Sequence, residues 1–547
     1  MNKVFLIIVL CSLNILSANA QKADLVFSSE KFLQKKGTSK LKILKNGNTA
    51  CIEMNTDDVL ICRLFDTNKK KVNEVKIELG DKLDNFRLRA VLEINKDLVV
   101  MFVSYPKKTP QLTRLIFDGT TGQLKSKEII LEMSTLSFMG DYAIKHDNIP
   151  IANFIVEKDP LSDYYAIVLF NPFADESNKR IEVVHYSPVH EVINRGYFLA
   201  PDNTMQETYI GDLFVNADKS IVVSTYAQKI SKIKSSDEGF FYISQLKKGA
   251  SIFTHKSFVK TNQYLDPACE LVFNKISGNV NAIAKVYLYD GKNSGSIQDG
   301  YSFTVQSFNP VTMEFGSTYK INLDKLKAYY AANINPTSEV QYNGLMQNFI
   351  ITPNGNSICL TEYTRLAANS NPGTTVIRAE YLTMLNGVGL TTLTPEGNVL
   401  NAKIIPYQHE HCGPETSSLY MNVKKGSLEF SYSDEFDGTC IELIPAQKNN
   451  YLLLNNTPGN FEKAENVKPA FYSIKSNTPN LTTCLYTIDV NGVTQKDYLF
   501  GKPTEGNIKC ALLNTADYDP ETGLYVTQVV EKINGEKKVS IVWFNLN

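Results

Sequence analysis

One short segment of the chain gathers residue types that commonly bind metal ions. Residues 407–415 read YQHEHCGPE and contain two of the six histidines, one cysteine and two glutamates. If the segment is extended, His409 and His411 project to the same side, and Cys412 or a neighbouring glutamate could complete a site. The sequence therefore makes His409, His411 and Cys412 candidate ligands of a divalent metal.

The same segment also has the character of an ordinary polar loop. It follows Ile404-Ile405-Pro406, where we expect a strand to end, and it precedes another expected strand near Leu419. A zinc site usually needs further ligands and outer partners for each imidazole, and neither a CxxC nor an HExxH motif provides them here. We therefore expect a connecting loop and no resident cofactor, and we keep the divalent metal as the alternative.

The N-terminus has the three parts of a secretory signal. A basic start at Lys3 precedes an apolar run from Val4 to Leu16, and Ala18-Asn19-Ala20 has the small-x-small form of a cleavage site. We expect residues 1–20 to be removed and the mature chain to be exported to the periplasm or beyond. Because the apolar run is too short to cross a bilayer, no membrane span is expected.

The cysteines suggest one disulfide. Removal of Cys11 with the signal leaves eight of the nine cysteines, an even number in an oxidising compartment. If residues 55–58 form a hairpin turn, Cys51 faces Cys62 across two strands, and facing residues can come close enough to bridge. The candidate pair is therefore Cys51 and Cys62, and the alternative is two buried thiols that pack as small apolar side chains.

Composition restricts the class of partner. The 56 basic and 57 acidic residues give a formal net charge of −1, so the chain as a whole does not attract nucleic acid or an anionic membrane. The hydrophobic fraction of 43% is ample for a packed core. We expect a protein or glycan partner, no nucleic acid, and a monomer.

Two patterns repeat along the mature chain. Tight-turn tripeptides such as Asn46-Gly47-Asn48 and Asn354-Gly355-Asn356 precede β-branched and aromatic runs of strand length. Segments such as 116–131 and 392–406 read as strand, Asp/Pro/Gly turn and strand. This succession is typical of antiparallel meanders.

Repeated four-stranded meanders close most naturally as a propeller. We predict an all-β fold in which residues 21–547 form a single β-propeller of about seven or eight four-stranded blades, with tandem β-sandwiches as the alternative. Residues 24–28 are expected to pair with the last strand, 539–544, and close the ring. A helix over 322–332 is expected as a loop insertion, where binding residues tend to collect.

In the block 349–434, a strand ends in Glu362 and Tyr363, an outer strand runs from Glu396-Gly397 to Ile405-Pro406 and Gln408, and SYSD follows at 431–434. This order resembles that of a group of uncharacterised exported β-repeat proteins of Bacteroidetes. It implies an extracytoplasmic all-β repeat protein and assigns no activity.

The motifs of common enzyme classes are missing from the sequence: GxSxG, a Walker loop, GxGxxG and an EF-hand loop. We therefore predict a non-enzymatic binding scaffold at the cell envelope. The alternative is a secreted hydrolase or lyase, glycan-active or metal-assisted, with its site at the mouth of the propeller channel.

Overall fold

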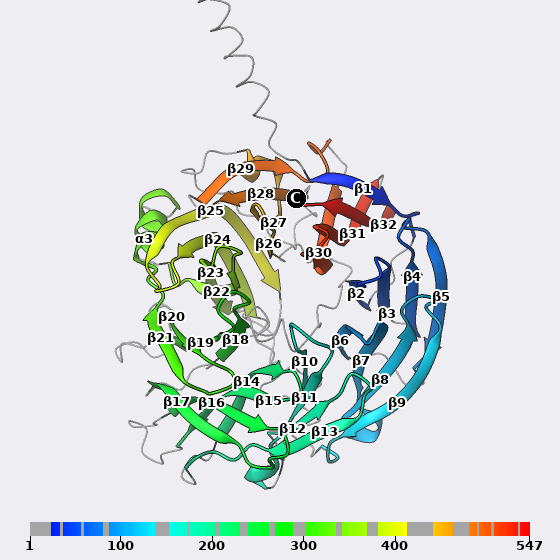
Figure 1. Ribbon diagram of the computed structural model, residues 1–547. Coiled ribbons are helices and arrows are strands. Elements are labelled where there is room, and N and C mark those ends of the chain that lie inside the picture. The colour runs from blue at the N-terminus through cyan, green and yellow to red at the C-terminus, as the bar shows by residue number, and fades with distance from the viewer. Residues whose placement is uncertain are drawn as a thin grey trace, which may run out of the picture.

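The chain folds into antiparallel β-strands arranged around a common centre (Figure 1). This arrangement is seen in a computed structural model. It describes residues 23–32, 37–55, 59–79, 87–136, 153–172, 174, 176–202, 205, 207–229, 239–261, 268–287, 301–334, 342–368, 381–412, 441–462, 481–489, 492–504, 508–533 and 536–546.

The strands form eight four-stranded blades. Six sheets each contain four consecutive strands, and an eight-stranded sheet contains two further meanders joined by the parallel pairing of Thr482 with Lys509. In seven blades the chain starts near the centre and moves outward strand by strand, and in the eighth the outermost strand comes from the N-terminus (Figure 1). The inner strands of neighbouring blades contact one another around the ring. The predicted β-propeller is therefore confirmed, and tandem β-sandwiches are excluded.

The blades are numbered in chain order. Blades 1 to 4 contain β2 (Gly37–Ile43), β3 (Thr49–Asn55), β4 (Val59–Phe65) and β5 (Lys71–Glu78); β6 (Arg87–Ile94), β7 (Asp97–Ser104), β8 (Gln111–Asp118) and β9 (Leu124–Glu132); β10 (Asn153–Lys158), β11 (Tyr165–Phe170), β12 (Ile181–Tyr186) and β13 (Val192–Tyr197); β14 (Glu207–Asn216), β15 (Ser220–Gln228), β16 (Gly239–Lys247) and β17 (Thr254–Thr261). Blades 5 to 8 contain β18 (Ala268–Phe273), β19 (Val280–Tyr287), β20 (Tyr301–Phe308) and β21 (Phe315–Lys320); β22 (Leu345–Ile351), β23 (Ser357–Ala368), β24 (Tyr381–Leu393) and β25 (Val399–Cys412); β26 (Ile441–Pro445), β27 (Asn450–Asn456), β28 (Thr482–Asp489) and β29 (Gly492–Tyr498); β30 (Ile508–Asp519), β31 (Leu524–Ile533), β32 (Glu536–Asn545) and β1 (Asp24–Ser28).

Burial explains the composition of the strands. The second strand of blade 4, β15, is buried along its whole length and reads SIVVSTYAQ, whereas the outer β9 of blade 2 reads LKSKEIILE and is mostly exposed. Apolar side chains on facing blades pack into shared clusters, such as the one that joins blades 3 and 4. Each fully buried Val, Leu or Ile side chain in these clusters contributes about 1.5–3 kcal/mol.

The N-terminal strand closes the ring. Strand β1 pairs antiparallel with β32, with Leu25 opposite Phe544, so the predicted pairing of residues 24–28 with the last strand is confirmed. Blade 8 is also tied to blade 1 through Trp543, which is fully buried and donates its indole N–H to Thr49 Oγ1 at 3.0 Å. The contact between blades 8 and 1 is called the seam below.

The two ends of the propeller differ in their connections. At one end, the short-turn end, tight turns join the first strand to the second, as at 95–96 and 217–219, and the third strand to the fourth, as at 119–123. At the other, the long-loop end, the connections include 133–152, 321–344 and 413–440. This end therefore carries most of the chain that the sheets do not require.

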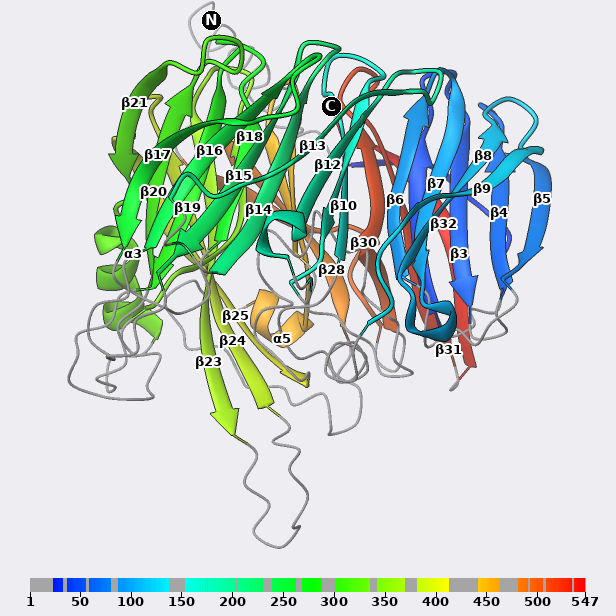
Figure 2. The same ribbon diagram turned by 90° about the horizontal axis from the view of Figure 1, so that it is seen from below.

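Helices lie at the long-loop end (Figure 2). Helix α3 (Asp324–Tyr329) continues into a π-helical turn, η4 (Tyr330–Ile334), between blades 5 and 6, which confirms the predicted insertion over 322–332. A second short helix, α5 (Pro458–Phe461), lies in blade 7. Among the described residues, the helices lack the length and apolar character needed to cross a bilayer. The expected signal, residues 1–20, lies outside the described residues.

Candidate functional site

Blade 6 projects beyond its neighbours at the long-loop end (Figure 2). Its strands β23, β24 and β25 have 12, 13 and 14 residues, and pairing continues from Thr364 opposite Leu385 out to Leu382 opposite Cys412. This three-stranded projection, residues 364–368, 381–386 and 407–412, is called the arm. It is the largest described departure from the regular blade pattern.

The candidate metal ligands lie in the arm. His409 pairs with Leu385, His411 with Thr383, and Cys412 with Leu382. The expected connecting loop is therefore wrong for residues 407–412, because the ladder between β24 and β25 continues through Cys412. The backbone is extended, as a site built on His409 and His411 requires. The side chains of residues 407–412 lie outside the described part of the structure, so the metal site itself stays a prediction.

The base of the arm is supported by the α3 insertion. Leu326 and Tyr330 are buried, and the Tyr330 ring stacks on Tyr363 of β23 with centroids 5.3 Å apart. Two glycines of β24 leave room for the insertion. A Cβ atom at Gly389 would lie 2.5 Å from the hydroxyl oxygen of Tyr342 and 2.8 Å from Leu326 Cδ1, and Gly387 has a φ of +77° that few other residues adopt.

A buried hydrogen bond completes this support. The Tyr342 hydroxyl lies 2.9 Å from Thr361 Oγ1 on β23, and burial raises the pKa of Tyr342 well above its usual value. Tyr342 therefore stays protonated and able to donate. Together with the stacked rings, this contact fixes the base of the arm, residues 361–363 of β23, against the insertion.

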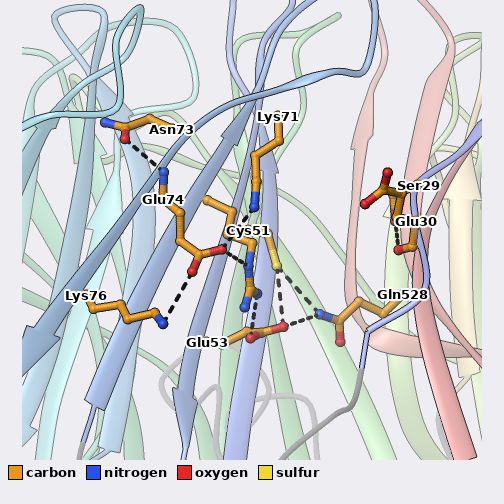
Figure 3. Close-up of polar contacts among 10 residues, drawn as sticks. Ser29, Glu30, Cys51, Glu53, Lys71, Asn73, Glu74, Lys76 and Gln528 are labelled. Carbon is orange, nitrogen blue, oxygen red and sulfur yellow. Dashed lines mark hydrogen bonds and ion pairs between the residues drawn. The ribbon is translucent and has the colours of Figure 1, made fainter.

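A second group of polar residues lies at the seam (Figure 3). On blade 1, Arg63 donates to Glu53 Oε2 at 2.6 Å and to Glu74 Oε2 at 2.9 Å. Burial disfavours the charge of Arg63, yet the adjacent carboxylates outweigh it and raise the pKa of the guanidinium. Gln528 of blade 8 donates Nε2 to Glu53 Oε1 at 3.3 Å and accepts from Ser39 Oγ at 2.7 Å. These residues satisfy one another, so we assign the network to closure of the ring.

The predicted disulfide between Cys51 and Cys62 is wrong. Asn55, rather than Met54, lies opposite Val59, so Cys51 pairs with Arg63 and Cys62 with Ile52. A register shift of one residue turns the two side chains to opposite faces of the sheet. Cys51 packs toward blade 8 and Cys62 toward blade 2, and both are free. Burial raises the pKa of Cys62 to about 12, so its thiol is un-ionised at neutral pH.

A polar cluster that no sequence motif predicts lies between blades 2 and 3. Arg114 on β8 donates to the Tyr165 hydroxyl and, through Nε at 3.1 Å, to Glu128. The same hydroxyl lies 3.1 Å from His190 Nδ1. Burial lowers the pKa of His190 to about 4, so its ring is neutral at pH 7. Only three-dimensional proximity connects these residues, which are far apart in sequence and follow no motif.

The chemistry of this cluster is limited by its burial. Tyr165 is fully buried and stacks on Tyr186 with centroids 4.9 Å apart and rings 6° from parallel. The Arg114 charge is balanced by Glu128. A tyrosine hydroxyl beside a neutral imidazole is capable of proton transfer, but Tyr165 presents no surface to a substrate. We therefore interpret the cluster as a structural link between blades.

The fold defines a β-propeller scaffold, and comparisons with known proteins add similarities of shape. No family model and no curated protein matches the sequence. Among solved structures, the chain is similar to prolyl oligopeptidase B from Galerina marginata (TM-score 0.39, 6% identity, 91% of this chain and 56% of that one). It is also similar to the polysaccharide lyase Uly1 (0.38, 10%, 84% and 90%). A third is the WD40 domain of SCAP from fission yeast (0.34, 8%, 96% and 98%). The chain thus spans little more than half of the oligopeptidase.

Proposed function

We propose that this protein is an exported binding scaffold that recognises a protein or glycan partner at the cell envelope through its long-loop end, with the arm as the main contact element. The observation that carries the proposal lies at the base of the arm. There, Leu326, Tyr330 and Tyr342 pack against the glycine positions of β24. Export is supported by the signal-like residues 1–20. The resemblance to exported Bacteroidetes proteins agrees with this location.

Rigidity is the physical reason to favour binding. A loop that becomes ordered only on binding loses conformational entropy at that moment, whereas an element held in advance does not. The described β23, β24 and β25 stay paired from blade 6 into the arm, with register shifts at Glu362/Tyr363 and at Asn386/Val388 where the arm begins. Rigid scaffolds commonly present their binding residues on long connections at one end. The long-loop end has both features.

A shortened arm tests the proposal. Replacing residues 365–384 by Asn-Gly connects Thr364 to its paired residue, Leu385, through a two-residue tight turn. Ligands captured by immobilised wild-type protein, from a glycan array and from solubilised envelope proteins, are expected to be lost. Thermal unfolding monitors the integrity of the ring.

The matched control is Val72→Ser on the outer strand β5, where the side chain is 49% exposed and far in sequence from the arm. It is expected to retain every ligand that the wild type captures. Retention of the same ligands by a folded, shortened-arm variant would show that the arm is not the contact element.

A second candidate function follows from the continuous strand through His409, His411 and Cys412. If these residues bind a divalent metal, the site would support a metal-assisted hydrolase or lyase at the long-loop end. If this candidate holds, native mass spectrometry of the purified protein finds one transition-metal ion per chain, and the double variant His409→Ala/His411→Ala loses it. A metal-free wild-type protein would remove this candidate and leave binding alone.

A further inference from the structure

The short-turn end carries large aliphatic side chains that are unusually exposed. Leu161 is 70% exposed, Val189 62%, Ile252 73%, Ile276 60% and Val311 51%. All five lie in tight turns of blades 3, 4 and 5, which are neighbours in the ring. We refer to these five residues as the turn-tip patch. Exposed apolar residues gathered in one sector of a surface commonly mark an interaction site.

Three of these side chains occupy equivalent positions. The backbone N–H groups of Leu161, Ile276 and Val311 each donate to the side-chain oxygen of an Asp or Asn two residues earlier. The bonds run to Asp159 at 3.1 Å, to Asn274 at 2.9 Å and to Asn309 at 2.9 Å. These hydrogen bonds restrain the backbone of each turn, so the exposed aliphatic side chain has a defined position.

In other blades, the residue two positions after the side chain that accepts its N–H is polar. In blade 2 Thr120 donates to Asp118, and in blade 8 Glu521 donates to Asp519. In blade 6 Glu396 donates to Thr394 Oγ1. The turn geometry therefore does not require an aliphatic residue. Among the turns of this end that the structure describes, the exposed aliphatic residues at this position lie in one sector, which indicates a role other than folding.

Basic residues surround the centre of the patch. Lys247 and Lys248 lie just before Ile252, Lys275 precedes Ile276, and Lys219 lies in the adjacent turn of blade 4; all four are exposed. Lys248 is paired with Asp218 at 2.7 Å, and Glu191 and Glu314 lie beside the outer members of the patch. The local positive charge is therefore concentrated around Ile252 and Ile276, although the net charge of the whole chain is near zero.

We propose that the turn-tip patch docks the protein on the surface of an anionic lipid bilayer. Aliphatic tips flanked by lysine combine insertion among acyl chains with attraction to anionic headgroups. The five side chains stand on separate turns. A deformable bilayer can receive each tip independently, whereas a protein partner would need a matching hollow for every tip. Docking by this end would leave the long-loop end and the arm facing away from the membrane.

Co-sedimentation of the mature chain with lipid vesicles tests the proposal. We expect binding to vesicles of phosphatidylcholine and phosphatidylglycerol in equal parts, and little binding to phosphatidylcholine alone. Ile252→Ser/Ile276→Ser should weaken partitioning about a hundredfold, since burial of each of the two side chains is worth about 1.4 kcal/mol, or tenfold. Each of Lys219→Gln and Lys275→Gln should weaken it about fivefold, from about 1 kcal/mol per lysine near the surface.

The matched control is again Val72→Ser, which removes an exposed aliphatic side chain outside the patch and should bind like the wild type. The shortened-arm variant should also keep vesicle binding, which separates this proposal from the proposed function. Equal binding of wild type and Ile252→Ser/Ile276→Ser would overturn it. So would a dimer, detected by light scattering, that the same double variant abolishes, because the patch would then join two copies of this chain.

Discussion

Replacement of Trp543 by alanine is expected to lower the free energy of unfolding by about 3–5 kcal/mol, the usual cost of removing a buried aromatic side chain. Trp543 is fully buried at the seam and packs edge-on against Phe65 of blade 1 with centroids 5.6 Å apart. Its loss leaves a cavity between the first and last blades and deprives Thr49 of a hydrogen-bond donor. Denaturant unfolding followed by far-ultraviolet circular dichroism measures the change.

Trp543→Phe provides the control for the seam. It keeps an aromatic ring and removes the indole N–H, so the expected loss is much smaller, about 1 kcal/mol beyond the change in packing. If Trp543→Ala unfolded at the same denaturant concentration as the wild type, the seam would not depend on this side chain. The pairing of β1 with β32 would then be the main closing contact.

Acid is expected to destabilise the fold through His185. This residue of β12 is fully buried, and burial lowers its pKa to about 4 from 6.5. The unfolded chain therefore binds a proton more readily than the folded one between these two values. The stability contributed by a neutral His185 is complete above about pH 6.5 and is lost as the pH falls to about 4. The loss from this residue is roughly 3 kcal/mol.

The comparison that isolates this effect is His185→Gln, which cannot gain a proton in this range. Denaturant unfolding of both proteins across the same pH interval is expected to show a shallower decline for the variant, by roughly 3 kcal/mol. His190, whose pKa burial also lowers to about 4, should account for part of the slope that remains. Identical slopes in the two proteins would mean that folding does not lower the pKa of His185.

Strand-period patterns and turn residues were sufficient to predict the repeated meander, the closing pair 24–28 with the last strand, and the helical insertion. These features depend on local sequence, which determines turns and alternation directly. The Cys51–Cys62 pairing failed for a related reason. Local sequence placed the turn between β3 and β4, but the expected register of the two strands was wrong by one residue. A shift of one residue moves a side chain to the opposite face relative to its expected partner.

Two of the features that could not be predicted from the sequence depend on contacts between blades. The Arg114–Tyr165–His190 cluster joins residues of blades 2 and 3, and the Gln528–Glu53 contact joins the ends of the chain. The arm was missed because the histidine-rich segment looked like a polar loop. Its pairing with β24 depends on residues 382–385, which are distant in sequence.

Site-specific photo-cross-linking distinguishes which end of the propeller binds the partner, and we expect it to be the long-loop end. A photoreactive residue is placed at the exposed position Lys325 on α3, or at the exposed position Ser277 on the short-turn end, and both proteins are irradiated with intact envelopes. A discrete protein or glycan adduct is expected from position 325 and none from position 277. The same adduct from position 277, with none from 325, would show that the partner binds at the short-turn end instead.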